Sequence, residues 1–62
     1  MFSDNFKRLM KEKEVNIPKI SEDKGIPMTT LYDWSNGRTV PRADTAKALA
    51  DYLGVSVDEL LQ

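Results

Sequence analysis

Apolar residues recur along this chain at the spacing of amphipathic helices, and Gly or Pro residues separate the later groups. The first group follows the i, i+4, i+7, i+8 pattern and consists of Phe2, Phe6, Leu9 and Met10. It predicts a helix over residues 3–13, with Ser3 as the N-cap. Aromatic and aliphatic residues beside Lys and Arg could also form a membrane-surface helix. Because three acidic residues dilute the basic face, we favour a helix that covers a core.

A second, short helix is expected next. Asn16 is a suitable N-cap, and Pro18 is tolerated in a first helical turn because the N–H that it lacks would have no partner there. A second helix is therefore predicted over 17–24, ending at Gly25. Ile17 and Ile20 would face inward.

The segment from Gly25 to Gly37 is the centre of the predicted fold. Pro27 sets the backbone for a first helical turn, and the Asn36-Gly37 pair supplies an exit with positive φ, so a third helix is predicted over 28–35. Its apolar side carries Leu31 and Trp34, which are expected in the core. The opposite, solvent-facing side would carry Met28, Thr29, Tyr32 and Asp33.

The last third of the chain predicts two more helices after a polar connection in which Val40 is the expected anchor. Residues 43–53 form one helix, closed by Gly54. Its apolar face consists of Ala43, Ala46, Leu49, Ala50 and Leu53. Ser56 and Glu59 match a capping box, flanked by a Val55 and Leu60 staple, so a fifth helix is predicted over 56–61.

Five helices with short joints, and no segment of alternating apolar residues, predict an all-α fold. A chain of 62 residues has room for one domain and one core. Every apolar stripe must then share that core. Its expected members are Phe6, Leu9, Ile20, Leu31, Trp34, Leu49, Leu53 and Leu60.

Composition narrows the function. The chain has no Cys and no His, and it lacks a Gly-rich phosphate loop, so we expect neither catalysis nor a metal or other cofactor. No apolar run reaches the roughly 20 residues of a membrane span, which favours a cytoplasmic protein without a membrane partner. The net charge is -1, but residues 1–42 carry +2 and residues 43–62 carry -3.

Two short helices joined by a Gly-containing turn form a helix-turn-helix arrangement. The motif residues resemble the lambda-repressor-like helix-turn-helix domains of phage repressors, Cro proteins and related (XRE-type) bacterial regulators. The most specific parts of this resemblance are Trp34-Ser-Asn-Gly37 and Leu53-Gly-Val-Ser-Val-Asp-Glu-Leu-Leu61; Asn16 to Ile26, Leu31 and Pro41 add to it. The resemblance covers nearly the whole chain. It implies that residues 1–62 form a compact five-helix DNA-binding domain, the N-terminal part of a longer regulator.

The resemblance further implies a double-stranded DNA operator, read by the third helix in the major groove. The partner would be a second copy, bound on a two-fold symmetric operator or through a C-terminal domain, at the nucleoid of a bacterial or phage-infected cell. The base-facing positions of the family fall on Met28, Thr29, Tyr32 and Asp33. The phosphate-contacting positions fall on Asn16, Asn36, Arg38 and Arg42; Lys19 is added because it lies in the first turn of the second helix.

Some residues depart from the family pattern. Ile17 stands where the family often has Gln, and the third helix offers no Arg, Gln or Asn on its outer side for bidentate contacts with guanine or adenine. Asp33 would be repelled by phosphates. These departures, with the net charge, keep a second function open, namely a protein-interaction module that has lost DNA affinity.

Overall fold

The computed structural model describes residues 1–62 and contains five helices and no strand. The helices are α1 (Phe2–Glu12), α2 (Ile17–Lys24), α3 (Met28–Ser35), α4 (Ala43–Leu53) and α5 (Val57–Leu61). All five predicted helices are confirmed, and α2, α3 and α4 match their predicted bounds. No helix is long and apolar enough to cross a membrane.

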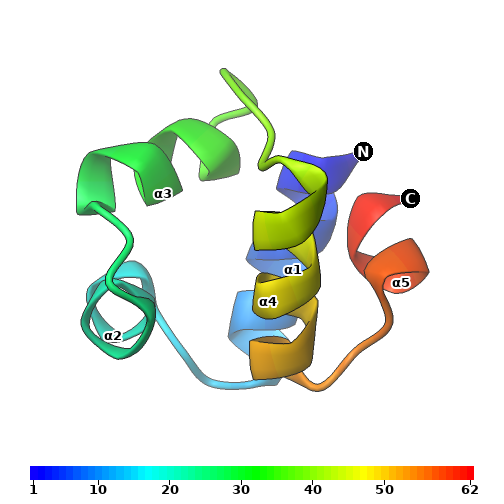
Figure 1. Ribbon diagram of the computed structural model, residues 1–62, viewed down its shortest axis with the longest axis horizontal. Helices are drawn as coiled ribbons and strands as arrows, with labels where there is room; N and C mark the ends of the chain where they lie inside the picture. Colours follow the sequence, from blue (N-terminus) through cyan, green and yellow to red (C-terminus); the bar gives the residue numbers. More distant parts are fainter.

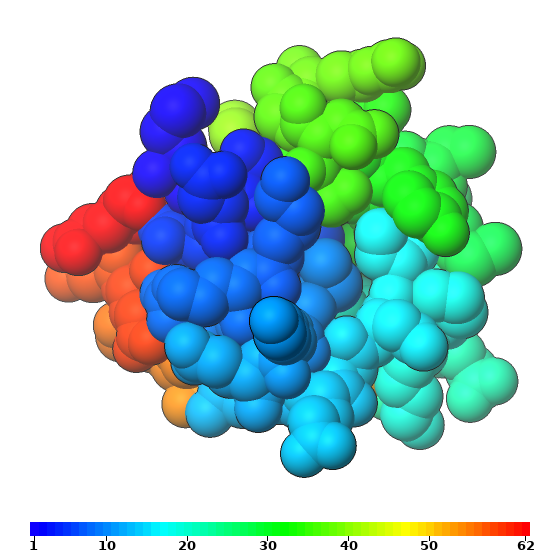
Figure 2. Space-filling view, turned by 180° about the vertical axis from the view of Figure 1, so that it is seen from behind, coloured from blue at the N-terminus to red at the C-terminus, as the bar shows by residue number.

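The helices divide the molecule into two sides. α2 and α3 lie on one side of the pair α1 and α4, and α5 lies on the other side, next to both termini (Figure 1). Packing follows the same division, because α1 contacts both α3 and α5 while α2 packs against α3. Seen from behind, α1 covers the centre of the molecule and the linker after α3 projects beyond it (Figure 2). The helix-turn-helix is thus supported by α1 through α3.

One hydrophobic core joins all five helices. All eight residues expected in it are buried, and six side chains are fully enclosed: Phe6, Leu9, Ile20, Leu31, Leu49 and Leu60. Phe2, Ile17 and Ala50 complete the cluster. A single cluster of this kind means that the orientation of α3 depends on every other helix.

Three helices end in the same hydrogen-bonded turn, the Schellman motif. After α3, the Gly37 N–H donates to the Trp34 carbonyl and the Arg38 N–H to the Asp33 carbonyl. Gly37 has φ 78°, a left-handed conformation that suits glycine. α4 ends in the same way at Gly54, whereas after α1 the left-handed position is held by Glu14, at φ 57°.

Four details of the sequence prediction are wrong. Ser3 is not an N-cap, because α1 already begins at Phe2, whose buried ring stacks on Phe6. Ala43 is exposed at the first residue of α4. Val40 is 66% exposed rather than an anchor, since the linker arches away from the body of the molecule (Figure 1).

The fourth detail concerns the capping box at α5. The Ser56 hydroxyl accepts the Glu59 N–H at 3.0 Å, but the reciprocal bond from the Glu59 side chain does not form. The helix accordingly begins at Val57, with Ser56 as its N-cap. One capping bond is therefore enough to define this start.

Candidate nucleic-acid interface

Aromatic packing fixes the inner side of α3. The Trp34 ring lies edge-on to both Phe2 and Phe6 of α1, with ring centroids 6.2 Å apart in each pair. Edge-to-face pairs of this kind contribute about 0.5 to 1.5 kcal/mol each beyond the area that they bury. Leu31, one helical turn before Trp34, is fully buried in the core. Trp34 is thus a core residue, as its position beside Leu31 predicted.

The outer side of α3 presents the four residues expected to face bases. Met28 and Tyr32 are 45% and 49% exposed, Thr29 is exposed and Asp33 is half-buried. Large apolar side chains left in water on a helix whose other side is buried are available for contact with a partner. The structure therefore brings these four side chains onto one open surface.

The turn between α2 and α3 is tied by a side chain. The Ser21 hydroxyl donates to the Ile26 carbonyl at 2.6 Å, and the Gly25 N–H donates to the Ser21 carbonyl at 2.9 Å. Gly25 adopts φ 70°, which a residue with a side chain rarely does. These bonds fix the angle between the two helices of the motif.

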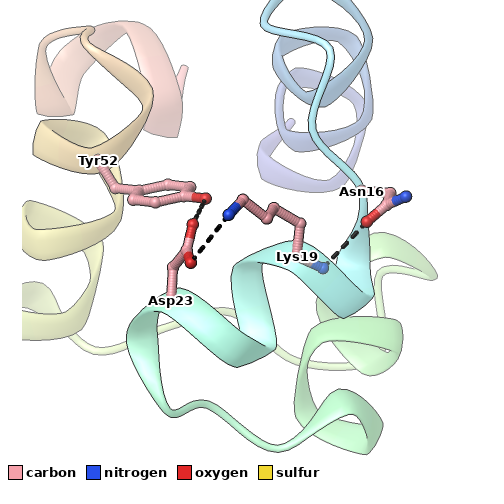
Figure 3. A network of polar contacts seen from close by, with 4 residues as sticks. All are labelled: Asn16, Lys19, Asp23 and Tyr52. Carbon is pink, nitrogen blue, oxygen red and sulfur yellow. Dashed lines mark hydrogen bonds and ion pairs between the residues drawn. The ribbon is translucent and has the colours of Figure 1, made fainter.

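The N-terminal turn of α2 carries two of the expected phosphate contacts. The Asn16 side-chain oxygen accepts the Lys19 N–H at 3.0 Å, so the predicted N-cap is confirmed (Figure 3). This bond uses the amide oxygen, and the amide nitrogen of exposed Asn16 remains a donor. A helix N-terminus also carries partial positive charge, which favours an anion.

Lys19 belongs to a polar network that joins α2 to α4. The Tyr52 hydroxyl donates to one oxygen of the Asp23 carboxylate at 2.6 Å, and the Lys19 ammonium donates to the other at 3.2 Å (Figure 3). We call the bond between Asp23 and Tyr52 the Asp23–Tyr52 clamp. It lowers the pKa of Asp23, with Lys19 adding to the effect, and it raises the pKa of Tyr52.

The remaining expected phosphate contacts follow α3. Asn36 and Arg38 lie in its exit turn, and Arg42 immediately precedes α4; all three are exposed. Arg38 lies 3.9 Å from the Asp33 carboxylate, and Arg42 lies 3.9 Å from that of Asp44. The site is thus spread over three places, namely the start of α2, the outer side of α3 and the linker after it.

The dimensions of the molecule and of α3 suit the major groove of DNA. The principal extents of the molecule are 24 × 22 × 21 Å. An α-helix with its side chains is about 10 to 12 Å across. The major groove of B-DNA is about 12 Å wide, so a helix exposed along one side fits into it.

The fold and this surface together define a helix-turn-helix protein. Residues 5–62 match the model of the family described as the Cro/C1-type HTH DNA-binding domain. The chain belongs to this family of DNA-binding domains, as the resemblance implied. No curated protein and no solved structure matches the chain. The match spans nearly all of the chain, so all five helices belong to the DNA-binding unit.

Two features of the surface were missed by sequence reasoning. The partnership of Asp23 with Tyr52 joins residues 29 positions apart, and no local pattern predicts such a contact. The approach of Arg38 to Asp33 could have been found. A Schellman motif places the third residue after the helix against the third from its end, and Asn36-Gly37 already marked that motif.

Proposed function

We propose that this domain binds a specific double-stranded operator by inserting α3 into the major groove, and that it acts as a transcriptional repressor of the phage or prophage type. The observation that carries the proposal is the construction of α3. Its inner side is fixed by Trp34 and Leu31, and its outer side leaves four side chains open. A rigid helix with one exposed side is the element that reads base edges in helix-turn-helix proteins.

The four exposed residues define a particular kind of base reading. The Thr29 methyl and the Met28 thioether suit the thymine methyl group, and the Asp33 carboxylate can accept from the cytosine amino group. The Tyr32 hydroxyl can reach a base or a phosphate. Positioning on the duplex is left to the proposed phosphate contacts, which are Asn16, Lys19, Asn36, Arg38 and Arg42.

Two copies would read a palindromic operator in the nucleoid of a bacterial or phage-infected cell. Half-site centres on such operators lie about 34 Å apart, one turn of B-DNA. Two domains with a longest extent of 24 Å fit side by side at this spacing. The copies would associate on the DNA, or through a C-terminal domain if these residues begin a longer regulator.

Selection of bound sequences from a random duplex pool tests the proposal. We expect an enriched sequence with two-fold symmetry and half-sites one helical turn apart. The matched variant carries Thr29→Ser, which removes the methyl group proposed to contact thymine and keeps the hydroxyl; it should alter the consensus without abolishing binding.

The same experiment tests a second candidate function. A protein-interaction module that keeps this scaffold would enrich no sequence and would show no salt-dependent binding to any duplex. The pairing of Lys19, Arg38 and Arg42 with carboxylates is the observation that favours this alternative. Enrichment of an operator would exclude it.

A further inference from the structure

Every basic side chain proposed to touch phosphate lies beside a carboxylate of the same chain. The three pairs are Lys19 with Asp23 at 3.2 Å, Arg38 with Asp33 at 3.9 Å and Arg42 with Asp44 at 3.9 Å. Of the six basic side chains elsewhere, only Arg8 and Lys47 have such a partner. Pairing is therefore complete at the proposed interface and partial outside it.

Local structure sets the position of two of these carboxylates, Asp23 and Asp33. Asp23 lies one helical turn after Lys19 and is held on its far side by Tyr52 of α4 (Figure 3). Asp33 lies under Arg38 because the Arg38 N–H donates to the Asp33 carbonyl at 2.9 Å in the exit turn of α3. These acids are thus placed by the fold beside the cations.

We propose that Asp23, Asp33 and Asp44 compete with DNA phosphate for Lys19, Arg38 and Arg42, and so limit the electrostatic affinity of the domain for every duplex. This inference rests on the proposed function. When a phosphate takes the place of a carboxylate at one of these cations, the displaced carboxylate stays within the screening length of about 8 Å at physiological salt. It then repels the phosphate that the cation attracts.

The competition has a consequence for recognition. Affinity for any duplex grows with the number of phosphates that a protein neutralises, and so does its dependence on salt. The carboxylates beside these cations reduce the number of phosphates that the domain effectively neutralises. A larger share of the binding free energy on an operator must then come from the base contacts of α3, which arbitrary DNA does not offer.

The test measures the binding of each acid variant to an unrelated 20-base-pair duplex between 50 and 200 mM salt. The variants are Asp23→Asn, Asp33→Ala and Asp44→Asn, singly and together. Asn at position 23 still accepts the Tyr52 hydroxyl. Asp51→Asn is the matched control, because Asp51 pairs with Lys47, which lies outside the proposed contacts. Far-UV circular dichroism verifies that each variant is folded.

Each single variant should steepen the slope of log K against log salt by about 0.9, the value for one more phosphate neutralised. The gain in affinity of a variant over the wild type should therefore be roughly 3- to 4-fold larger at 50 mM salt than at 200 mM salt. The control should keep the wild-type slope. Because each acid is removed separately, the unfolding of one variant still leaves two tests.

The failures are distinguishable. If the wild-type domain selects an operator but the three variants keep its slope or match the control, this inference is overturned and the proposed function stands. If neither the wild type nor the triple variant selects a sequence, the proposed function fails and the inference fails with it.

Discussion

At the scale of single residues, Asp33 has the most specific expected role. It is the only charged residue between Gly25 and Gly37, and it is half-buried on the open side of α3. Changing Asp33 to Ala should strengthen binding to arbitrary duplex, because a negative charge near phosphates is removed. It should also erase a preference at one base pair that is worth roughly 1 to 3 kcal/mol.

The two effects of the Asp33 change must occur together, and a panel of operators with single base-pair changes measures both. Asp44→Ala is the control for the base-pair preference, since Asp44 also lies beside an arginine but is not on α3; it should strengthen binding and keep the wild-type discrimination. If Asp33→Ala keeps the wild-type discrimination at every position, Asp33 does not face the bases and serves only its contact with Arg38.

Arg38 and Arg42 are expected to contact phosphate rather than bases. Replacing either with Ala should weaken binding to all duplexes by the same factor and should reduce the salt slope by about one. Titrations of an operator and an unrelated duplex at several salt concentrations measure this, with Lys11→Ala on α1 as a control of equal charge. An effect confined to one sequence would assign that arginine to a base.

At the scale of elements, the end of α1 departs from the other Schellman turns. Glu14 occupies the left-handed position at φ 57°, where a residue with Cβ is strained by about 1 to 2 kcal/mol. Glu14→Gly removes this strain, but glycine loses more backbone entropy on folding. We therefore expect a net gain of roughly 0.5 to 1 kcal/mol and a Tm higher by a few degrees.

The control for this change is Lys7→Gly, in the exposed middle of α1. Glycine there should destabilise the domain by about 1 kcal/mol, because the backbone is helical and gains nothing from a permitted positive φ. Thermal melts of the two variants should consequently shift in opposite directions. A lower Tm for Glu14→Gly would show that the Glu14 side chain contributes more than its strained backbone costs.

The Asp23–Tyr52 clamp should make the attachment of α2 to α4 depend on pH at both extremes. The pKa of Asp23 is lowered from 3.8 by the Tyr52 hydroxyl and Lys19, so its contribution is present above about pH 4 and is lost as pH falls through the folded pKa. The pKa of Tyr52 is raised from 10.0, so its contribution is present below about pH 10 and is lost as pH rises through the folded value.

Tyr52→Phe isolates the clamp, because it removes the hydroxyl and keeps the ring. The difference in Tm between the wild type and this variant should be constant from about pH 5 to pH 9 and should shrink outside that window. Tyr32→Phe is the control, as the Tyr32 hydroxyl has no bond in the structure. A difference that does not change with pH would mean that the hydroxyl does not hold the Asp23 carboxylate.

The helices were predictable from sequence to the extent that their causes are local. Gly25 and Gly54 end helices by their own conformation, and Asn16 begins one with a bond to a residue three positions away. The start of α1 was misjudged at Ser3 because the ring of Phe2 meets Trp34, which lies far along the chain. A contact of this kind outweighs a favourable cap, and only the tertiary structure contains it.

Only some features of the candidate site were predictable from the sequence. The outer side of α3 follows from the burial of Leu31 and Trp34, so the exposure of Met28 and Tyr32 could be expected. The exposure of Val40 could not be expected from the sequence, because the path of a linker depends on the positions of the two helices that it joins. The Asp23–Tyr52 clamp depends on the packing of α2 near α4, and no sequence pattern encodes that distance.

At the scale of the whole molecule, one core holds the interface in place. Leu31 of α3 and Leu49 of α4 are both fully enclosed in it. Truncating either to Ala should cost about 2 to 5 kcal/mol, a large part of the stability of a small domain. Chemical denaturation measures the loss, and Leu61→Ala is the control because Leu61 is 44% exposed. An unchanged midpoint for both core variants would contradict the assignment of one shared core.

The packing of α1 against α5 also determines when the domain can fold. Leu60 is fully buried in the cluster that begins at Phe2, and Asn5 of α1 donates to the Leu60 carbonyl at 3.2 Å. Chains emerge from the ribosome N-terminus first, and contacts between distant residues must wait for the later one. A nascent chain that ends before Leu60 would expose part of this core, so the support of α3 is complete only after α5 has been synthesised.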